Sequence, residues 1–174
     1  LHLSIRRQRQ MCIRDRQHTL ILQAFEDMQK AGGNILCGGK APKSNGLTDG
    51  YYIEPTLIEG LDSESPHLQK ELFGPVATVQ KAKSLEDALD IANSSEYGLT
   101  AAIHTTNVDR AMWFAQHMRA GLVNINIGTF GSEPHMPFGG LGQSGNGSRE
   151  PGVEALDVYS ELKNISFLVR QEQL

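Results

Sequence analysis

The sequence of 174 residues is long enough for one domain, and its 39% hydrophobic content is enough for a packed core. Its formal net charge of -4 comes from interspersed residues, so neither a basic stripe for nucleic acid nor a polybasic run for anionic lipid is present. No apolar run has the length that a membrane span requires. Cys12 and Cys37 make neither a disulfide framework nor a zinc-binding spacing. We therefore expect a reduced, soluble, cytoplasmic protein with neither nucleic acid nor membrane as a partner.

The first sixteen residues differ in character from the rest of the chain. Residues 1–16 carry a basic excess, no helix cap and little periodicity. A targeting peptide is one interpretation, since leader sequences that are rich in arginine and poor in acidic residues exist. The stretch Met-Cys-Ile-Arg-Asp-Arg at residues 11–16 also resembles the translation of a transposon end used in preparing sequencing libraries. This resemblance favours a non-native extension, so we expect the native fold to begin near Gln17.

A helix is predicted from Thr19, because apolar residues recur there at the three- and four-residue spacing of one helical face. These residues are Leu20, Ile21, Ala24, Phe25 and Met28. Gly32-Gly33 supplies a residue with positive φ that ends the helix. Short strands are predicted at residues 34–37 and 51–58, on either side of a polar loop. Pro55 places the second strand at an edge or a bulge.

Strands and helices alternate through the rest of the chain. A single helical turn is expected at residues 65–70, further helices at 84–93, 107–119 and 152–158, and strands at 76–79, 99–103, 122–127 and 160–169. Ser84 and Asn107 have the side chains of helix N-caps. The alternation predicts an α/β fold with an open, mostly parallel sheet and right-handed crossover helices.

The stretch from Pro137 to Gly152 contains too many glycines for a helix or a strand and is predicted to be a loop. Residues 140–145 match the letters of the dinucleotide-binding glycine pattern. However, a true site follows a strand and opens a long helix, and the sequence on both sides fits neither requirement. We therefore do not expect a phosphate site here.

Titratable residues give few chemical signals. The six histidines are scattered without a metal-ligand spacing, so no metal site is predicted. Cys37 is expected to be a small buried hydrophobe rather than a nucleophile, because it lies in a short apolar strand. Glu71 and Phe73 stand two residues apart before Gly-Pro, where both can point into a cleft. A carboxylate suits a ribose diol and an aromatic ring suits a flat heterocycle, whereas the alternative is a capped turn with a buried phenylalanine.

The order of several motifs resembles the aldehyde dehydrogenase superfamily over residues 18–167. The motifs are Gly-Tyr-Tyr-Ile-Glu-Pro-Thr at 50–56, Lys-Glu-Leu-Phe-Gly-Pro-Val at 70–76, Ala-Asn-Ser-Ser-Glu-Tyr-Gly-Leu-Thr-Ala at 92–101, Ala-Gly-Leu-Val-Asn at 120–124, Pro-Phe-Gly-Gly at 137–140 with Ser144-Gly145, and Tyr-Ser-Glu-Leu-Lys at 159–163. Any one of them is weak, but their occurrence in register makes the resemblance specific.

The resemblance implies a cofactor, a substrate and a mode of assembly. Glu71 would hold the nicotinamide ribose of NAD or NADP, and Phe73 would pack near the nicotinamide. The segment from Asn126 to Met136 would line the aldehyde tunnel, with Phe138 at its wall. Within this predicted substrate pocket the named residues are Asn126, Phe130, His135 and Phe138. Residues 160–169 would be an arm that joins the sheet of a second copy by strand addition, giving a homo-oligomer.

The resemblance also implies that this chain is a part of a longer enzyme. It is expected to comprise an extension at residues 1–16, the C-terminal part of a catalytic domain at 17–158, and an arm at 159–174. The family's cofactor-binding domain, nucleophilic cysteine, glutamate base and oxyanion asparagine are not among its motifs, so no catalytic residue is predicted. Two local features, a long segment after Asn124 and the extra Ser148, resemble bacterial semialdehyde dehydrogenases. The alternative is a non-catalytic α/β module that acts through strand-mediated association.

Overall fold

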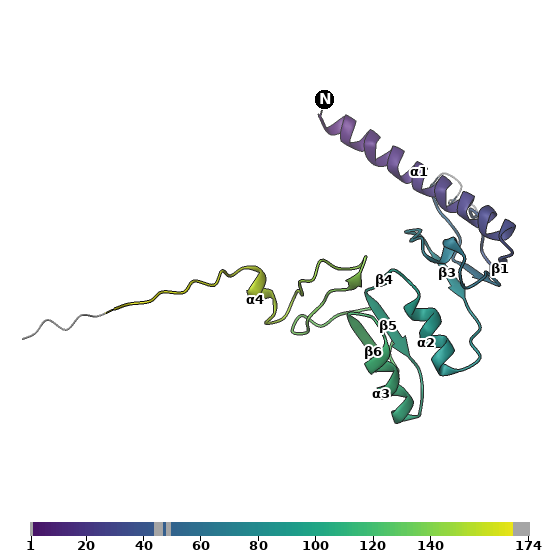
Figure 1. The fold of residues 1–174 in the computed structure, drawn as a ribbon. Helices are drawn as coiled ribbons and strands as arrows, with labels where there is room; N and C mark the ends of the chain where they lie inside the picture. The colour runs from purple at the N-terminus through teal and green to yellow at the C-terminus, as the bar shows by residue number, and fades with distance from the viewer. Residues whose placement is uncertain (1, 44–46, 48–49, 169–174) are drawn as a thin grey trace, which may run out of the picture. The chain divides into compact units, whose positions relative to one another are not determined.

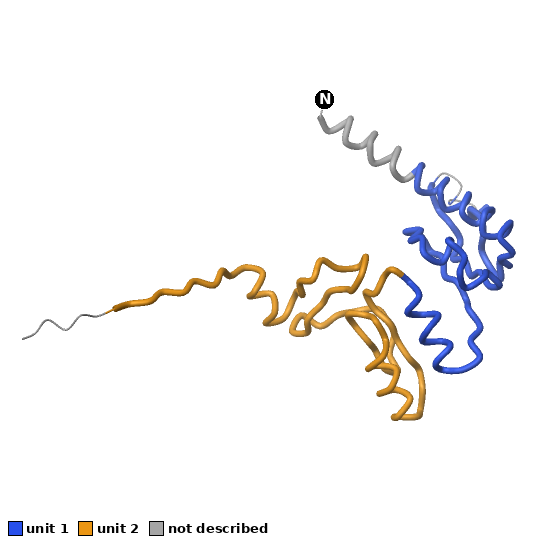
Figure 2. The backbone as a smooth tube through the Cα atoms, viewed as in Figure 1, with its two compact units in different colours: residues 1–95 blue, residues 96–174 orange. Residues whose placement is uncertain are grey.

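The structure is a computed structural model that describes residues 2–43, 47 and 50–168. For residues 2–14 it describes the backbone, and side chains are described from Asp15 onward. The chain forms two compact units, Leu1–Ser95 and Glu96–Leu174, which are coloured separately in Figure 2.

The described residues of unit 1 form two helices and a three-stranded sheet, whose arrangement can be followed in Figure 1. Its elements are α1 (His2–Lys30), β1 (Asn34–Cys37), β2 (Thr56–Glu59), the 3-10 turn η1 (Pro66–Leu68), β3 (Val76–Val79) and α2 (Leu85–Asn93). The central strand β2 pairs antiparallel with β1 and parallel with β3. The β1–β2 pairing contains a bulge opposite Leu57, between Ile35 and Cys37.

The core of unit 1 lies between α1 and the end of β2. Its buried members are Ile21, Phe25, Met28, Ile58 and Leu61. Phe25 is 1% exposed and Ile58 is fully buried. Each such side chain contributes about 1.5–3 kcal/mol relative to its exposed state, so this contact is the main reason why α1 packs on the sheet.

Helix α1 confirms the predicted periodicity and corrects two details. The helix begins at His2 rather than at Thr19, because a helix once formed extends at little cost through residues without a breaker. Leu20 is 46% exposed and lies outside the core, since the buried stripe follows Ile21, Phe25 and Met28. Gly32 ends the helix with φ at 95°, as the sequence predicts.

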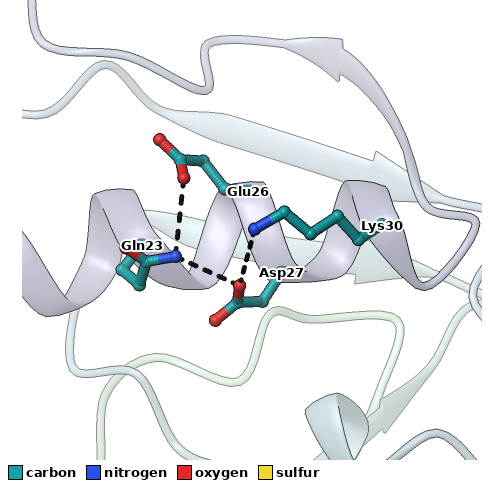
Figure 3. Close-up of polar contacts among 4 residues, drawn as sticks. All are labelled: Gln23, Glu26, Asp27 and Lys30. Carbon is teal, nitrogen blue, oxygen red and sulfur yellow. Dashed lines mark hydrogen bonds and ion pairs between the residues drawn. The ribbon is translucent and has the colours of Figure 1, made fainter.

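The outer face of α1 carries a polar network (Figure 3). Gln23 Nε2 donates to Asp27 Oδ1 at 3.1 Å and to Glu26 Oε2 at 3.4 Å. Lys30 Nζ donates to the same Asp27 oxygen at 3.4 Å. These pairs at three- and four-residue spacing stabilise the solvent-facing side of the helix.

The predicted caps are confirmed with one difference. Ser84 Oγ accepts from the Asp87 N–H at 3.2 Å and begins α2 at Leu85. Asp87 Oδ2 accepts in return from the N–H of Lys83, one residue before the position that a capping box uses. Asn107 Oδ1 accepts from the Arg110 N–H at 3.0 Å and begins the helix of unit 2.

Unit 2 is built around one parallel crossover. Its elements are β4 (Tyr97–Gly98), β5 (Thr100–Ile103), α3 (Val108–His117), β6 (Leu122–Ile125), β7 (Leu141–Gly142) and α4 (Ala155–Val158). Strands β5 and β6 pair in parallel through α3, and the short strands β4 and β7 pair antiparallel. Ala111 and Phe114 of α3 are buried, as their spacing predicts.

The α/β class with open sheets and crossover helices is confirmed. The strand pairing shows how the strands are distributed among the sheets. The described strands form three separate sheets, with two parallel and two antiparallel pairings. The sequence predicts a strand from residue 51, but β2 begins only at Thr56, directly after Pro55. Pro55 has no N–H to donate to a neighbouring strand, which accounts for this start.

Two further expectations are wrong. Cys37 is exposed and not buried. The reason is that Ile35 is the one residue among the four of β1 that packs against the core. The strand predicted at residues 160–169 is not formed at residues 160–168, which have no regular secondary structure, and Val169 lies outside the described residues. A strand requires hydrogen bonds to a neighbouring strand, and the described part of this chain offers it none.

Candidate functional site

The turn that precedes β3 holds Phe73 in an unusual conformation. Its φ is 45°, in the left-handed region that bulky residues rarely adopt. Its side chain is 79% exposed, so core packing does not explain this conformation. Backbone strain of this kind is concentrated at functional sites and persists only where the surroundings hold it. Phe73 is therefore the first candidate for a binding role.

Helix α1 supplies the groups that hold this turn. Gln17 Nε2 donates to the Leu72 carbonyl at 2.6 Å, across 55 positions of the sequence. The next residue, His18, donates from Nε2 to the Tyr52 carbonyl at 3.1 Å. Gly74 lies so close to Ile21 that a Cβ there would stand 2.6 Å from the isoleucine Cδ1. Neighbouring residues of α1 thus fix the turn and the segment around Tyr52.

These segments line an open pocket of about 500 Å³. It is lined by Gln17, His18, Ile21, Gly50, Tyr51, Tyr52, Ile53, Phe73, Gly74 and Pro75. The volume lies within the range that small-molecule sites occupy, about 300–1,000 Å³. All of its lining residues belong to unit 1.

The pocket has the character of a site for a flat organic group. Phe73, Tyr51 and Tyr52 expose 79%, 47% and 51% of their surfaces, and the rings of His18 and Tyr51 stand 5.9 Å apart at 59°. Clustered exposed aromatic side chains indicate a binding surface, because leaving them in water costs free energy. Aromatic faces also stack well on planar ligands.

The structure separates the two residues predicted to bind the cofactor. Phe73 lines the pocket, but Glu71 is exposed and is not among the lining residues. The buried phenylalanine of the alternative interpretation is not what the structure has, since the ring is largely exposed.

Asn126, the first residue of the predicted substrate segment, has a structural task in unit 2. Its Oδ1 accepts from the Thr105 N–H at 2.8 Å, and its Nδ2 donates to the Thr105 carbonyl at 3.0 Å. Its φ of 59° is left-handed, a conformation that asparagine tolerates better than most residues. The side chain therefore closes the ends of β5 and β6.

The other three predicted substrate residues lie in the loop after β6. Phe130 is 87% exposed, Phe138 is 38% exposed, and His135 is exposed. Among the described residues, no hydrogen bond or ring contact joins any two of them. Unit 2 by itself does not assemble these side chains into one pocket wall.

Several lining residues were not predicted from the sequence. Gln17 and His18 are not predicted as site residues, because they directly follow residues 1–16, the predicted non-native extension. The sequence predicts Tyr51 and Tyr52 as strand residues, although a pair of tyrosines beside a polar loop is itself a signal for an amphipathic surface.

Other site types find no support in the described part of the chain. None of its helices is long and apolar enough to cross a membrane. No group of three or more potential metal ligands occurs among the described side chains. Gly140–Gly145, the segment with the dinucleotide letters, contains β7 and a turn, and Ser144 Oγ accepts from the Gly98 N–H at 3.2 Å.

Residues 6–165 match the Aldehyde dehydrogenase family. This match covers most of the sequence, and the chain belongs to the aldehyde dehydrogenase family.

Two curated relatives illustrate the range of aldehydes in this family. The chain is 38% identical over 144 residues to the alpha-ketoglutaric semialdehyde dehydrogenase of Bacillus subtilis (strain 168), covering 83% of this chain and 30% of that protein. It is 35% identical over 156 residues to the NAD(+) benzaldehyde dehydrogenase of Pseudomonas putida, covering 90% of this chain and 31% of that protein. The chain thus spans less than a third of the length of either relative.

Solved structures agree on the fold. PnpE of Pseudomonas sp. WBC-3 is 41% identical with a TM-score of 0.78, over 83% of this chain and 29% of that one. Betaine aldehyde dehydrogenase of Staphylococcus aureus, solved in complex with NAD+, is 34% identical with a TM-score of 0.78, over 83% of this chain and 28% of that one.

Proposed function

We propose that this chain is the C-terminal part of the catalytic region of an NAD(P)-dependent aldehyde dehydrogenase, which oxidises an aldehyde to a carboxylic acid in the cytoplasm. The observation that carries this proposal is the Phe73 pocket. An exposed aromatic ring is held in a left-handed turn by the hydrogen bond from Gln17 to Leu72. Backbone strain of this kind is expected where an aromatic ring has to be held in position to contact a ligand.

The residues at this pocket fit the nicotinamide end of NAD or NADP. The flat heterocycle suits the faces of Phe73 and Tyr51. The carboxylate of Glu71, two residues upstream, suits the ribose diol because it can accept two hydrogen bonds. Glu71 lies outside the pocket, so the ribose would extend from the pocket toward the exposed side of the turn. When bound, the nicotinamide supplies the hydride acceptor, and the side chains orient it.

The remaining chemistry is assigned to a longer chain. We propose that the nucleophilic cysteine, the glutamate base and the oxyanion asparagine lie outside this sequence, so the 174-residue chain alone does not oxidise aldehydes. A cysteine thiolate that forms a covalent intermediate splits a difficult step into easier ones, and the chain without it loses that route.

The proposed substrate is an aldehyde, with a semialdehyde as the first choice. The likeness to a semialdehyde dehydrogenase at 38% identity supports this choice. The segment that follows β6, with Asn126, Phe130 and His135, and Phe138 beyond it, is proposed to line the substrate tunnel of the longer enzyme.

We also propose self-association through the tail, residues 160–169. Four apolar side chains of its described part are exposed by at least two thirds, namely Leu162, Ile165, Phe167 and Leu168. An extended segment with such side chains gains free energy by pairing with the sheet of a second copy.

The test begins with the genomic reading frame upstream of Gln17. If it continues into a region with a glycine-flanked cysteine, the complete enzyme is expressed and assayed for NADH or NADPH with semialdehydes, benzaldehyde and betaine aldehyde. The proposal expects reduced cofactor with at least one aldehyde. A complete enzyme that forms none, or a short chain that forms it above the blank, would contradict the assignment.

A further inference from the structure

We propose that Asn146 is a site of spontaneous covalent modification, at which the side-chain amide is lost and the residue becomes aspartate or isoaspartate. Asn146 lies in unit 2 between β7 and α4, and Gly147 follows it. Both residues are exposed to solvent. This inference is independent of the function proposed above, because it concerns the reactivity of the loop alone.

The geometry brings the reacting groups together. Asn146 Oδ1 accepts from the Ser148 N–H at 3.0 Å. This bond closes a ring over the Gly147 peptide and holds the Asn146 amide over the backbone of Gly147. That nitrogen makes no hydrogen bond within the part of the chain that the structure describes.

Gly147 leaves room for the reaction. Its φ is 96°, and no heavy atom lies within 4 Å of the position where a Cβ would stand. A glycine reaches the backbone conformations of a cyclic intermediate more easily than any other residue. No packed neighbour has to move.

Ser148 activates the amide. Its hydroxyl donates to Asn146 Oδ1 at 2.6 Å, so the same oxygen accepts two hydrogen bonds. Donors that point at this oxygen withdraw electrons from the amide carbon and stabilise the negative charge that develops when the carbon is attacked.

The reaction needs only water as a co-reactant. The Gly147 nitrogen attacks Cγ of Asn146, a carbon–nitrogen bond forms, and ammonia leaves with the proton of the Gly147 N–H. Water then adds to either carbonyl of the resulting succinimide and breaks one of its carbon–nitrogen bonds. The products are aspartate and isoaspartate, and nothing is oxidised or reduced. One neutral amide becomes a carboxylate, so the formal net charge changes from -4 to -5.

The experiment compares the folded chain with the same chain unfolded in guanidinium. Both samples are incubated at mildly alkaline pH and then digested with trypsin. Mass spectrometry of the peptides measures the mass increase that replacement of an amide by a carboxylate produces. We expect Asn146 to convert at least as fast in the folded chain as in the unfolded one. Slower conversion in the folded chain would overturn the proposal, because the loop would then protect the amide.

Two variants separate the contributions. Ser148→Ala removes the hydroxyl and is expected to slow conversion of the folded chain by about two- to tenfold, the effect of one hydrogen bond, with no change in guanidinium. Equal folded rates would overturn the role of Ser148. Asn146→Gln is the control that abolishes the mass change in this peptide. The second Asn-Gly pair, Asn45-Gly46, lies outside the described residues and serves as the internal reference.

Discussion

The side chain of Asn126 holds both backbone polar groups of Thr105. Oδ1 accepts from the N–H at 2.8 Å and Nδ2 donates to the carbonyl at 3.0 Å, while the Asn126 N–H donates to the Ile103 carbonyl at 2.8 Å. The segment after β5 is therefore fastened to the end of β6 by one residue. This arrangement explains an asparagine at a left-handed position without any ligand.

Asn126→Gly and Asn126→Ala separate the side-chain bonds from the backbone conformation. Asn126→Gly is expected to lower the free energy of unfolding by about 1–3 kcal/mol, because two hydrogen bonds are lost. Asn126→Ala is expected to cost about 1–2 kcal/mol more, since alanine is strained at a φ of 59°. Denaturant unfolding measures the free energy of unfolding of both variants. Equal decreases for the two would contradict a left-handed backbone at residue 126.

Phe25→Ala tests the core of unit 1. The side chain is 1% exposed, so its removal is expected to lower the free energy of unfolding by about 3–5 kcal/mol. Leu20→Ala, five residues earlier on α1 and 46% exposed, is the matched control and is expected to change the free energy of unfolding by about 0.5 kcal/mol or less. If the two variants lose similar free energies of unfolding, the face of α1 that carries Phe25 is not the one that packs against the sheet.

Phe73→Gly distinguishes binding from folding. Glycine relieves the left-handed strain but makes the unfolded chain more flexible, so the free energy of unfolding is expected to stay within about 1 kcal/mol of the original. Binding of nicotinamide mononucleotide is expected to weaken or vanish. The measurement is the chemical-shift change of His18 and Tyr51 on addition of this ligand. If the variant unfolds, or binds as well as the original chain, the ring does not have the proposed role.

The pKa of Asp27 is expected to lie below its ordinary value of 3.8. The hydrogen bond from Gln23 is the main cause, partial burial acts against it, and the hydrogen bond and charge of Lys30 add to the lowering. Because the folded pKa is depressed, the stabilising contribution is present above pH 3.8 and is lost as the pH falls through the folded value. Carboxyl NMR titration measures this pKa, and Gln23→Ala should raise it. No rise would remove Gln23 as the cause.

Deletion of residues 161–174 tests the tail. The deletion removes the exposed Leu162, Ile165, Phe167 and Leu168 and is expected to raise the soluble monomer fraction seen by light scattering at tens of micromolar. A clean monomer with the tail present would count against association through it, as would an assembly that survives the deletion.

The helices and most strand positions followed from local sequence. Ser84 and Asn107 cap their helices with bonds to residues three positions ahead, and Ile21, Phe25 and Met28 repeat with the helical period. Such features are predictable because the interacting groups are neighbours in the chain. The family motifs likewise point to Phe73 from the sequence alone.

The tertiary structure decided what depends on distant residues. The bond from Gln17 to Leu72 spans 55 positions, and the pocket exists only because α1, the Tyr51 segment and the Phe73 turn meet. The exposure of Cys37 and the division of the described strands into three sheets also depend on which strands pair with one another. A short strand has the same local sequence whether it is paired, central or at an edge, so its burial is set by packing against residues far along the chain.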